Sequence, residues 1–157
     1  MLSEFHIIQA IIFGAVFAYL TAIIIMNTVI KTMTTTINGW STTLKCGRPG
    51  NGILLRAASA KFLPMVNVVE EAAYWTTTID SAGKKLNGRY DYLLHFPAGE
   101  LPPNDAFWSL TITDVLGYMV NNSIDRHSLG DNSRLVSNGD GSIDIYLQCS
   151  APIGHEP

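Results

Sequence analysis

The chain has 157 residues, of which 15% are charged, and a formal net charge of −3. This length suits one ordinary domain, and a mildly acidic chain without a basic stripe argues against nucleic acid as a partner. Residues 1–35 contain only Glu4 and Lys31 as charged side chains, so the later residues carry the whole net charge.

The first predicted element is a transmembrane anchor helix over residues 1–31. Residues 7–30 are uncharged, and as a helix they would span about 36 Å against a hydrocarbon core of roughly 30 Å. The alternative, a cleaved signal peptide, needs a basic start, a shorter apolar stretch and a small-residue cleavage site. The start MLSEFH has no Lys or Arg, so we predict a retained single-pass anchor.

Small residues recur at every fourth position of this anchor, and they are Ala10, Gly14, Ala18 and Ala22. Such a seam lets helix backbones approach closely in lipid, and polar Gln9 and Asn27 also favour a helix partner. The predicted partners are therefore the membrane and other transmembrane helices, from a second copy or another protein.

The two cysteines, Cys46 and Cys149, leave two alternatives open. A disulfide between them would close a loop of about 100 residues, worth about 4–5 kcal/mol in the chain-entropy model, and it would require an oxidising compartment. The other alternative is two inert buried thiols. Lys31 favours a cytoplasmic β domain by the positive-inside rule, whereas the cysteines favour export, and we predict an extracytoplasmic β domain.

Residues 32–157 are predicted to form a β domain that begins with a Thr-rich stalk at about 32–37. A first strand is expected near 37–44, and Asn51 is a candidate cap for the domain's single helix over 52–62, which Pro64 ends. The stretch 68–79 is β-prone and is predicted as a strand. Asn87-Gly88 is a hairpin signal, and it leads into a strand at 89–96 with alternating inward and outward side chains.

The stretch LPPNDAFWSLTITD, residues 101–114, is predicted to be the central strand after a proline-rich entry. Its alternation places Trp108 and Leu110 on the buried face. A further strand is expected at 118–120, and Asn138–Gly141 form a turn before a last strand at 142–149. Six or more short strands with turns between them predict a mainly β fold, an antiparallel jelly-roll-like sandwich.

Several motifs together resemble the family called domain of unknown function 1214. They are residues 54–57 (LLRA), 71–74 (EAAY), 86–90 (LNGRY), 101–114, 126–129 (RHSL), 138–142 (NGDGS) and 146–148 (YLQ), with Asn121. The resemblance implies a jelly-roll-like β domain, which in some members follows an N-terminal membrane helix. It implies no established reaction.

Four residues of the matching stretches form a candidate ligand site: Trp108, Asp114, Asn121 and Arg126. Arg126 could bind a carboxylate or sugar hydroxyls beside Trp108. In the structural interpretation, which we favour, Asp114 and Asn121 satisfy turn backbones, Trp108 fills the core and Arg126 braces a loop.

Other chemistry has little support in the sequence. His6, His95, His127 and His155 lack metal-ligand spacing and the cysteines form no CxxC motif, so no metal is predicted. No phosphate-binding glycine loop is present, and we predict no cofactor. Ser109, His127 and either Asp125 or Asp144 would supply the residue types of a hydrolase triad, but Ser109 lies within a regular strand rather than a nucleophile elbow.

These observations favour a non-catalytic, membrane-anchored accessory or structural subunit. Its helix would pack in a larger membrane assembly, and its exported β domain would be an interaction module. One alternative is an anchored domain that binds or processes a small ligand or carbohydrate. Another is a pilin-like filament subunit with a helical core and a β head, although pilins place glutamate at the fifth residue and the acidic residue here is Glu4.

Overall fold

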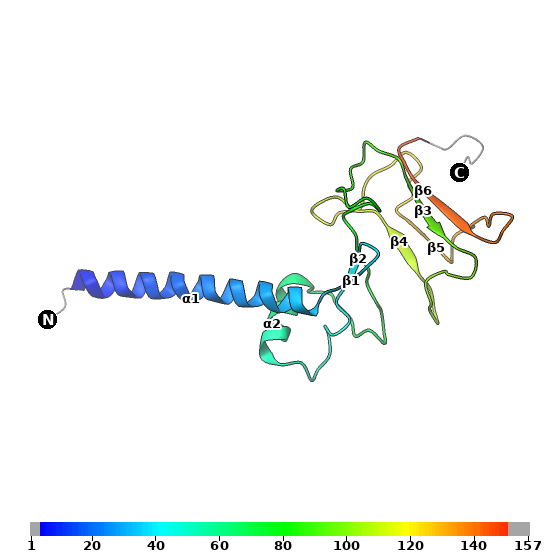
Figure 1. Cartoon of the computed structure of the whole chain (residues 1–157). Coiled ribbons are helices and arrows are strands. Elements are labelled where there is room, and N and C mark those ends of the chain that lie inside the picture. The colour runs from blue at the N-terminus through cyan, green and yellow to red at the C-terminus, as the bar shows by residue number, and fades with distance from the viewer. Residues whose placement is uncertain (1–3, 151–157) are drawn as a thin grey trace. The chain divides into compact units, whose positions relative to one another are not determined.

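The computed structural model describes residues 4–150, and the chain divides into two compact units (Figure 1). Unit 1 is Met1–Leu86 and unit 2 is Asn87–Pro157. The described residues form two helices and six short strands: α1 (Glu4–Met33), β1 (Thr35–Ile37), β2 (Trp40–Thr42), α2 (Ile53–Phe62), β3 (Tyr92–Phe96), β4 (Ser109–Thr111), β5 (Ser128–Gly130) and β6 (Ile143–Leu147).

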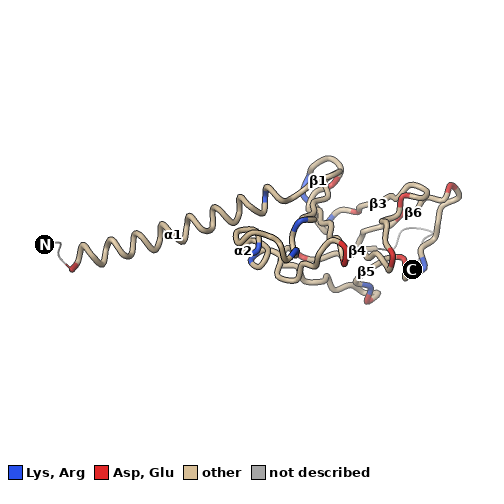
Figure 2. The backbone as a smooth tube through the Cα atoms, turned by 90° about the horizontal axis from the view of Figure 1, so that it is seen from below, with Lys and Arg blue, Asp and Glu red and all other residues tan. Residues whose placement is uncertain are grey.

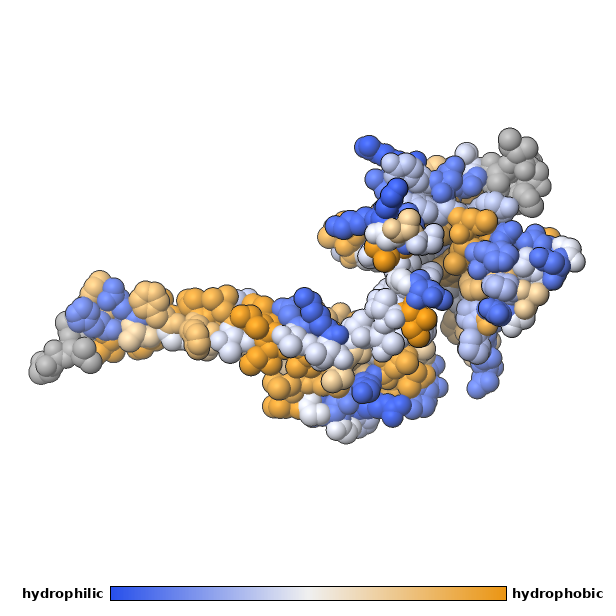
Figure 3. All heavy atoms as spheres, viewed as in Figure 1, coloured by the Kyte–Doolittle hydropathy of each residue, from blue (hydrophilic) through white to orange (hydrophobic). Residues whose placement is uncertain are grey.

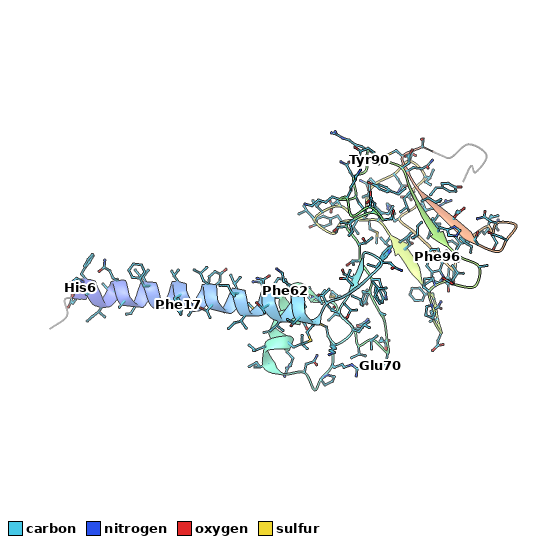
Figure 4. The ribbon with its side chains drawn as sticks, in the orientation of Figure 1. His6, Phe17, Phe62, Glu70, Tyr90 and Phe96 are labelled. Atoms are coloured by element: carbon cyan, nitrogen blue, oxygen red, sulfur yellow. The ribbon has the colours of Figure 1, made fainter. Side chains whose placement is uncertain are left out.

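The long apolar helix predicted at the N-terminus is confirmed as α1, whose 30 residues make it about 45 Å long. Most of its apolar side chains are exposed; Phe17, for example, projects from the helix with 74% of its surface accessible (Figure 4). Its polar side chains bond within the helix, because Asn27 Nδ2 and Thr28 Oγ1 each donate to a carbonyl four residues earlier, at 2.9 Å. These bonds give one donor of each side chain a partner within the helix.

Residues 35–42 form a hairpin rather than the predicted stalk and single strand. β1 pairs antiparallel with β2, and Ile37 lies opposite Trp40. The two turn residues, Asn38 and Gly39, have φ angles of 49° and 80°, as a two-residue hairpin turn of the Asn-Gly kind requires. The Asn-Gly signal at residues 87–88 leads instead to a simple turn, in which Tyr90 N donates to Asn87 O.

The helix predicted over residues 52–62 is confirmed as α2, which packs beside the C-terminal end of α1 (Figures 1 and 2). Its inner side contains the buried Ala58 and Ser59. The proposed cap was wrong, because Gly52 is the N-cap residue and Asn51 Nδ2 donates to Lys45 O at 2.8 Å. The side chain of Asn51 therefore braces the preceding loop instead of the first turn of the helix.

The predicted strand over residues 68–79 was also wrong. Glu71 N and Ala72 N both donate to Val68 O, at 2.9 and 3.0 Å, which folds the start of this segment into a turn. Farther along, Thr76 and Ile79 form only isolated bridges, Thr76 to Ser41 and Ile79 to Lys85. The β-prone residues of this segment thus have partners at single positions, too few to extend a ladder.

Unit 2 contains two separate antiparallel pairs. β3 pairs with β6 from Tyr92 opposite Leu147 to Phe96 opposite Ile143, and β4 pairs with β5 from Ser109 opposite Gly130 to Thr111 opposite Ser128. The predicted alternation is confirmed in β3 and β6, where the inward Ile143 and Ile145 are buried. These two isoleucines form the apolar centre of the β3–β6 sheet.

The expectation of a mainly β jelly-roll sandwich is met only in part. The described residues contain two helices, one of them long and apolar, and three antiparallel pairs of two strands each. Local alternation marks where single strands lie, but which strands join into one sheet depends on contacts between distant residues. The central strand predicted within residues 101–114 is accordingly shorter, as β4. The strand expected at 118–120 is only a single bridge from Met119 to Thr113.

Candidate functional site

A cluster of polar side chains lies on the outer face of the β3–β6 sheet and in the turn before β6. We call it the β3–β6 polar cluster, and it consists of His95, Asn138, Asp140, Ser142 and Asp144. His95 and Asp144 are directly opposite each other in the strand register, and His95 Nδ1 is 2.7 Å from Asp144 Oδ1. About half of the His95 side chain is exposed (51%), so solvent reaches this pair.

Hydrogen bonds to both side-chain oxygens of Asp144 stabilise its carboxylate form. The hydrogen bond from His95, and after it the bond from Asn138 Nδ2 to Oδ2 at 3.0 Å, lower the pKa of Asp144 below its usual range. An ionised carboxylate only accepts hydrogen bonds, so Nδ1 of His95 is the donor. Nε2 points away from this bond, and it accepts a hydrogen bond in the neutral imidazole and donates one in the imidazolium.

Asp140 closes the turn that carries the cluster. Its Oδ1 accepts from Ser142 Oγ at 2.7 Å and from Ser142 N at 2.9 Å, and these bonds lower the pKa of Asp140. Gly141 has a φ of 85° in the same turn, a conformation that glycine adopts without strain. The predicted turn at Asn138–Gly141 is confirmed, and it fixes Asn138 against Asp144.

Asp114 serves the backbone of its own turn, as in the structural interpretation. Its Oδ1 accepts from Leu116 N at 2.8 Å and from Tyr118 N at 2.9 Å. The turn places two apolar side chains in solvent, with Val115 fully exposed and Leu116 78% exposed. Asp114 therefore shapes an exposed hairpin whose tip is apolar.

The structural interpretation predicts that Asn121 satisfies a turn backbone and that Arg126 braces a loop. In the structure Asn122 holds the backbone of the loop before Arg126. Asn122 Oδ1 accepts from Arg126 N at 2.9 Å, and Asn122 Nδ2 donates to Arg126 O at 2.8 Å. This pair of bonds fixes the backbone of Arg126 and leaves its guanidinium exposed. Asn121 is also exposed. Two adjacent asparagines in the sequence gave no signal to distinguish their roles.

Trp108 lies far from Arg126 along the β4–β5 ladder. Trp108 is half-buried and its ring packs on Phe96, with the ring centroids 5.6 Å apart. Trp108 comes one residue before Ser109, which faces Gly130 at one end of the ladder. Arg126 comes two residues before Ser128, which faces Thr111 at the other end. At about 3.3 Å per residue this register separates Trp108 from the level of Arg126 by about 17 Å. Trp108 thus belongs to the apolar packing, and Asp114 and Arg126 lie toward the other end of the ladder.

The two aspartates considered for a hydrolase triad, Asp125 and Asp144, belong to different histidine–aspartate pairs. His127 Nε2 is 3.1 Å from Asp125 Oδ1, and Asp144 bonds to His95 instead. Ser109 pairs with Gly130, three residues beyond His127 along β5. His127 Nδ1 is buried without a hydrogen-bond partner among the described residues. The alternation of the two strands predicts that His95 and Asp144 both point outward, but it does not predict their pairing, because only the tertiary register brings β3 beside β6.

The remaining predicted residues occupy different surroundings. Cys46 is a buried free thiol in unit 1, and Cys149 is an exposed free thiol in unit 2 whose Sγ donates to Gly88 O at 3.4 Å. A bridge between them stays a prediction. The helix seam is exposed at all four of its small residues, Ala10, Gly14, Ala18 and Ala22. Over residues 4–150 no group of acidic, histidine or cysteine side chains is arranged to hold a metal ion, and His155 lies outside the described residues.

Comparison with known proteins gives a family and one informative structure. The model of the family described as "Protein of unknown function (DUF1214)" matches residues 71–157, more than half of the chain, and the chain belongs to this family. The resemblance seen in the sequence motifs is thereby confirmed. The match begins at the EAAY motif and includes the β3–β6 polar cluster.

Among solved structures, the chain is similar to the VPA0106 protein from Vibrio parahaemolyticus. The two share 29% sequence identity with a TM-score of 0.50, over 64% of this chain and 25% of that one. The chain therefore matches about a quarter of the length of its structural relative. No curated protein matches the sequence.

Proposed function

We propose that the chain is a membrane-anchored, non-catalytic accessory subunit. In this proposal α1 spans the bilayer and packs against other transmembrane helices, and the β domain, built on a jelly-roll plan, is an interaction module. The observation that carries it is the surface of α1. Its 30 residues have one charged side chain in the first turn and one in the last, and none of the side chains in its apolar window is buried.

The exposed seam supports the idea of a helix partner. A Cβ added at Gly14 would meet no atom within 4 Å, so a partner helix has room to approach the axis of α1 closely at this position. Small residues at such a position favour close helix packing in lipid, where water does not drive association.

Two matched single substitutions on α1 test the proposal. Gly14→Leu would fill the seam, and Ala15→Leu adds a comparable side chain about 100° away around the helix, as its control. After carbonate washing, the chain should remain with the membrane. In mild detergent it should migrate as an assembly that Gly14→Leu disrupts and Ala15→Leu preserves. Release by carbonate, or an isolated monomer throughout, would refute the proposal.

The side of the membrane on which the β domain lies is a separate question with two opposing criteria. The two cysteines favour export, whereas the Lys/Arg residues that follow the apolar stretch, Lys31, Lys45 and Arg48, favour the cytoplasmic side by the positive-inside rule. Cys149 is exposed, so a membrane-impermeant maleimide decides between them. Labelling in intact cells means export, and labelling only after lysis means a cytoplasmic domain.

The β3–β6 polar cluster favours a second candidate function, the binding of a small ligand. An oriented and exposed histidine, with a carboxylate fixed behind it, suits recognition of a hydroxyl or a carboxylate. A thermal-shift screen with sugars and carboxylates tests this candidate. Stabilisation that His95→Ala abolishes would support the cluster, and stabilisation that Arg126→Ala abolishes would support the site predicted from sequence. The absence of any stabilising compound would count against both.

A further inference from the structure

The helix α2 has an apolar outer surface beside the most apolar helix of the chain. Ala58 and Ser59 are buried on its inner side, whereas Ile53 is 82% exposed and Leu54 52% exposed. Met65, just beyond the helix, is 85% exposed. An apolar helix surface is normally covered by protein or lipid.

The position of α2 along α1 indicates what covers it. Side chains from Glu4 to Leu20 are exposed, apart from the half-buried Gln9, and the other half-buried positions of α1 begin at Thr21 and continue to Met33. The bare segment is therefore about 26 Å long, close to the hydrocarbon thickness of roughly 30 Å. α2 packs beside the remaining part (Figures 1 and 2), which is where the headgroup region would begin. Figure 3 shows the apolar surface of α1 continuing onto the region of α2.

The charges around α2 fit an anionic surface. The sequence has no Asp or Glu between Glu4 and Glu70, but this interval contains five basic residues: Lys31, Lys45, Arg48, Arg56 and Lys61. Arg48 is paired with Glu70, and Glu71 follows Glu70 in the sequence. Arg56 and Lys61 are exposed on α2 itself, and at 100° per residue they lie on either side of Ile53.

We propose that α2 is an interfacial helix that lies in the surface of an anionic bilayer. Ile53, Leu54 and Met65 insert among the lipid chains, and Arg56 and Lys61 bind headgroup phosphates. This inference rests on the proposed function, since α1 must span the membrane for α2 to reach its surface. It adds to the anchor a surface that binds anionic lipid. The small-residue seam of α1 alone would not distinguish anionic from neutral headgroups.

Spin-label depth measurement on the full chain in nanodiscs tests the proposal. In a Cys149→Ser background, single cysteines replace Ile53, Phe13 in the bare part of α1, and Ser81 in an exposed turn of unit 1. Cys46 is 1% exposed and is not labelled in the folded chain. Collisions with oxygen report lipid, and collisions with a water-soluble nickel complex report water. We expect the labels at positions 13 and 53 to be in lipid and the label at 81 to be in water.

A second set of measurements varies the lipid composition and the charge of α2. In nanodiscs with phosphatidylserine, Arg56→Gln combined with Lys61→Gln should lower the ratio of lipid-embedded to water-exposed label at position 53 by about 25-fold, at about fivefold per charge. Neutral phosphatidylcholine should have a similar effect on the unsubstituted helix. An equal ratio in both lipids and both variants would overturn the assignment of anionic headgroups.

The label at position 13 distinguishes failure of the membrane anchor from failure of the interfacial helix. If positions 13 and 53 are both in water, the membrane anchor itself is refuted. If position 13 is in lipid and position 53 is in water, the anchor stands and the interfacial helix is refuted. If position 53 is shielded from both oxygen and nickel, a protein partner covers α2, which also overturns the proposal.

Discussion

The register of the β4–β5 pair predicts that Gly130 tolerates no side chain. Gly130 is buried opposite Ser109, and a Cβ added there would collide with the carbonyl oxygen of Trp108. It would also lie 3.2 Å from the Cα of Ser109. Both neighbours are backbone atoms, so no rotamer change relieves the contact, and Gly130→Ala must push the two strands apart.

The expected cost follows from what the displacement disrupts. Overpacking a well-filled site costs about 1–3 kcal/mol, and the upper end applies because the obstacle is backbone. The displacement also strains the turn in which Gly130 N donates to Ser133 Oγ at 3.0 Å and Ser133 N donates to Gly130 O at 2.9 Å. We therefore expect Gly130→Ala to lower the free energy of unfolding by about 3 kcal/mol.

Urea unfolding of the full chain in mild detergent measures this cost. With Trp40 and Trp75 both replaced by Phe, the fluorescence of Trp108 is the probe, because its ring packs on Phe96 within the same unit. At about 1 kcal/mol/M for a small unit, the midpoint should fall by about 3 M. The matched control is Gly139→Ala, where an added Cβ meets nothing within 4 Å, and its effect should stay within about 0.5 kcal/mol. Equal midpoints for the two variants would refute the register.

Three further predictions concern the polar groups and the thiols. The lowered pKa of Asp144 means that its contribution to stability is present above the unfolded-state pKa of about 3.9 and is lost as pH falls through the folded-state pKa; urea midpoints from pH 6 to pH 2 should decline less steeply for Asp144→Asn. Asp114→Ala removes two hydrogen bonds from its turn and should lower the free energy of unfolding by about 1–2 kcal/mol in the same assay. Cys149 should react with a thiol reagent in the folded chain and Cys46 only after unfolding, since the first is exposed and the second buried.

Each of these predictions has a defined contrary result. An unchanged pH slope in Asp144→Asn would mean that the bonds from His95 and Asn138 do not hold the carboxylate. For Asp114, the control is the exposed Asp105→Ala, and equal losses in the two variants would remove the turn argument. If neither thiol reacts until a reductant is added, the chain contains the disulfide that the sequence left open.

Local patterns predicted the elements whose determinants are close in sequence. Uncharged residues 7–30 predicted α1, Pro64 predicted the end of α2, and the alternation around Ile143 and Ile145 predicted β6. The same reasoning failed over residues 68–79, because β-prone side chains need a neighbouring strand, and the partners there are isolated residues. Capping at Asn51 failed for a similar reason, since the carbonyl of Lys45 competes for its side chain.

What the sequence determined by itself is the separation of a long apolar helix from a turn-rich remainder with alternating strands, together with the family motifs. Hydrophobic period and turn chemistry are properties of neighbouring residues, and they can be predicted without knowing the fold. The tertiary structure alone decided that His95 faces Asp144, that Trp108 and Arg126 lie at opposite ends of a ladder, and that α2 packs beside the end of α1. These arrangements depend on strand register and helix packing, in which residues tens of positions apart in the sequence come into contact.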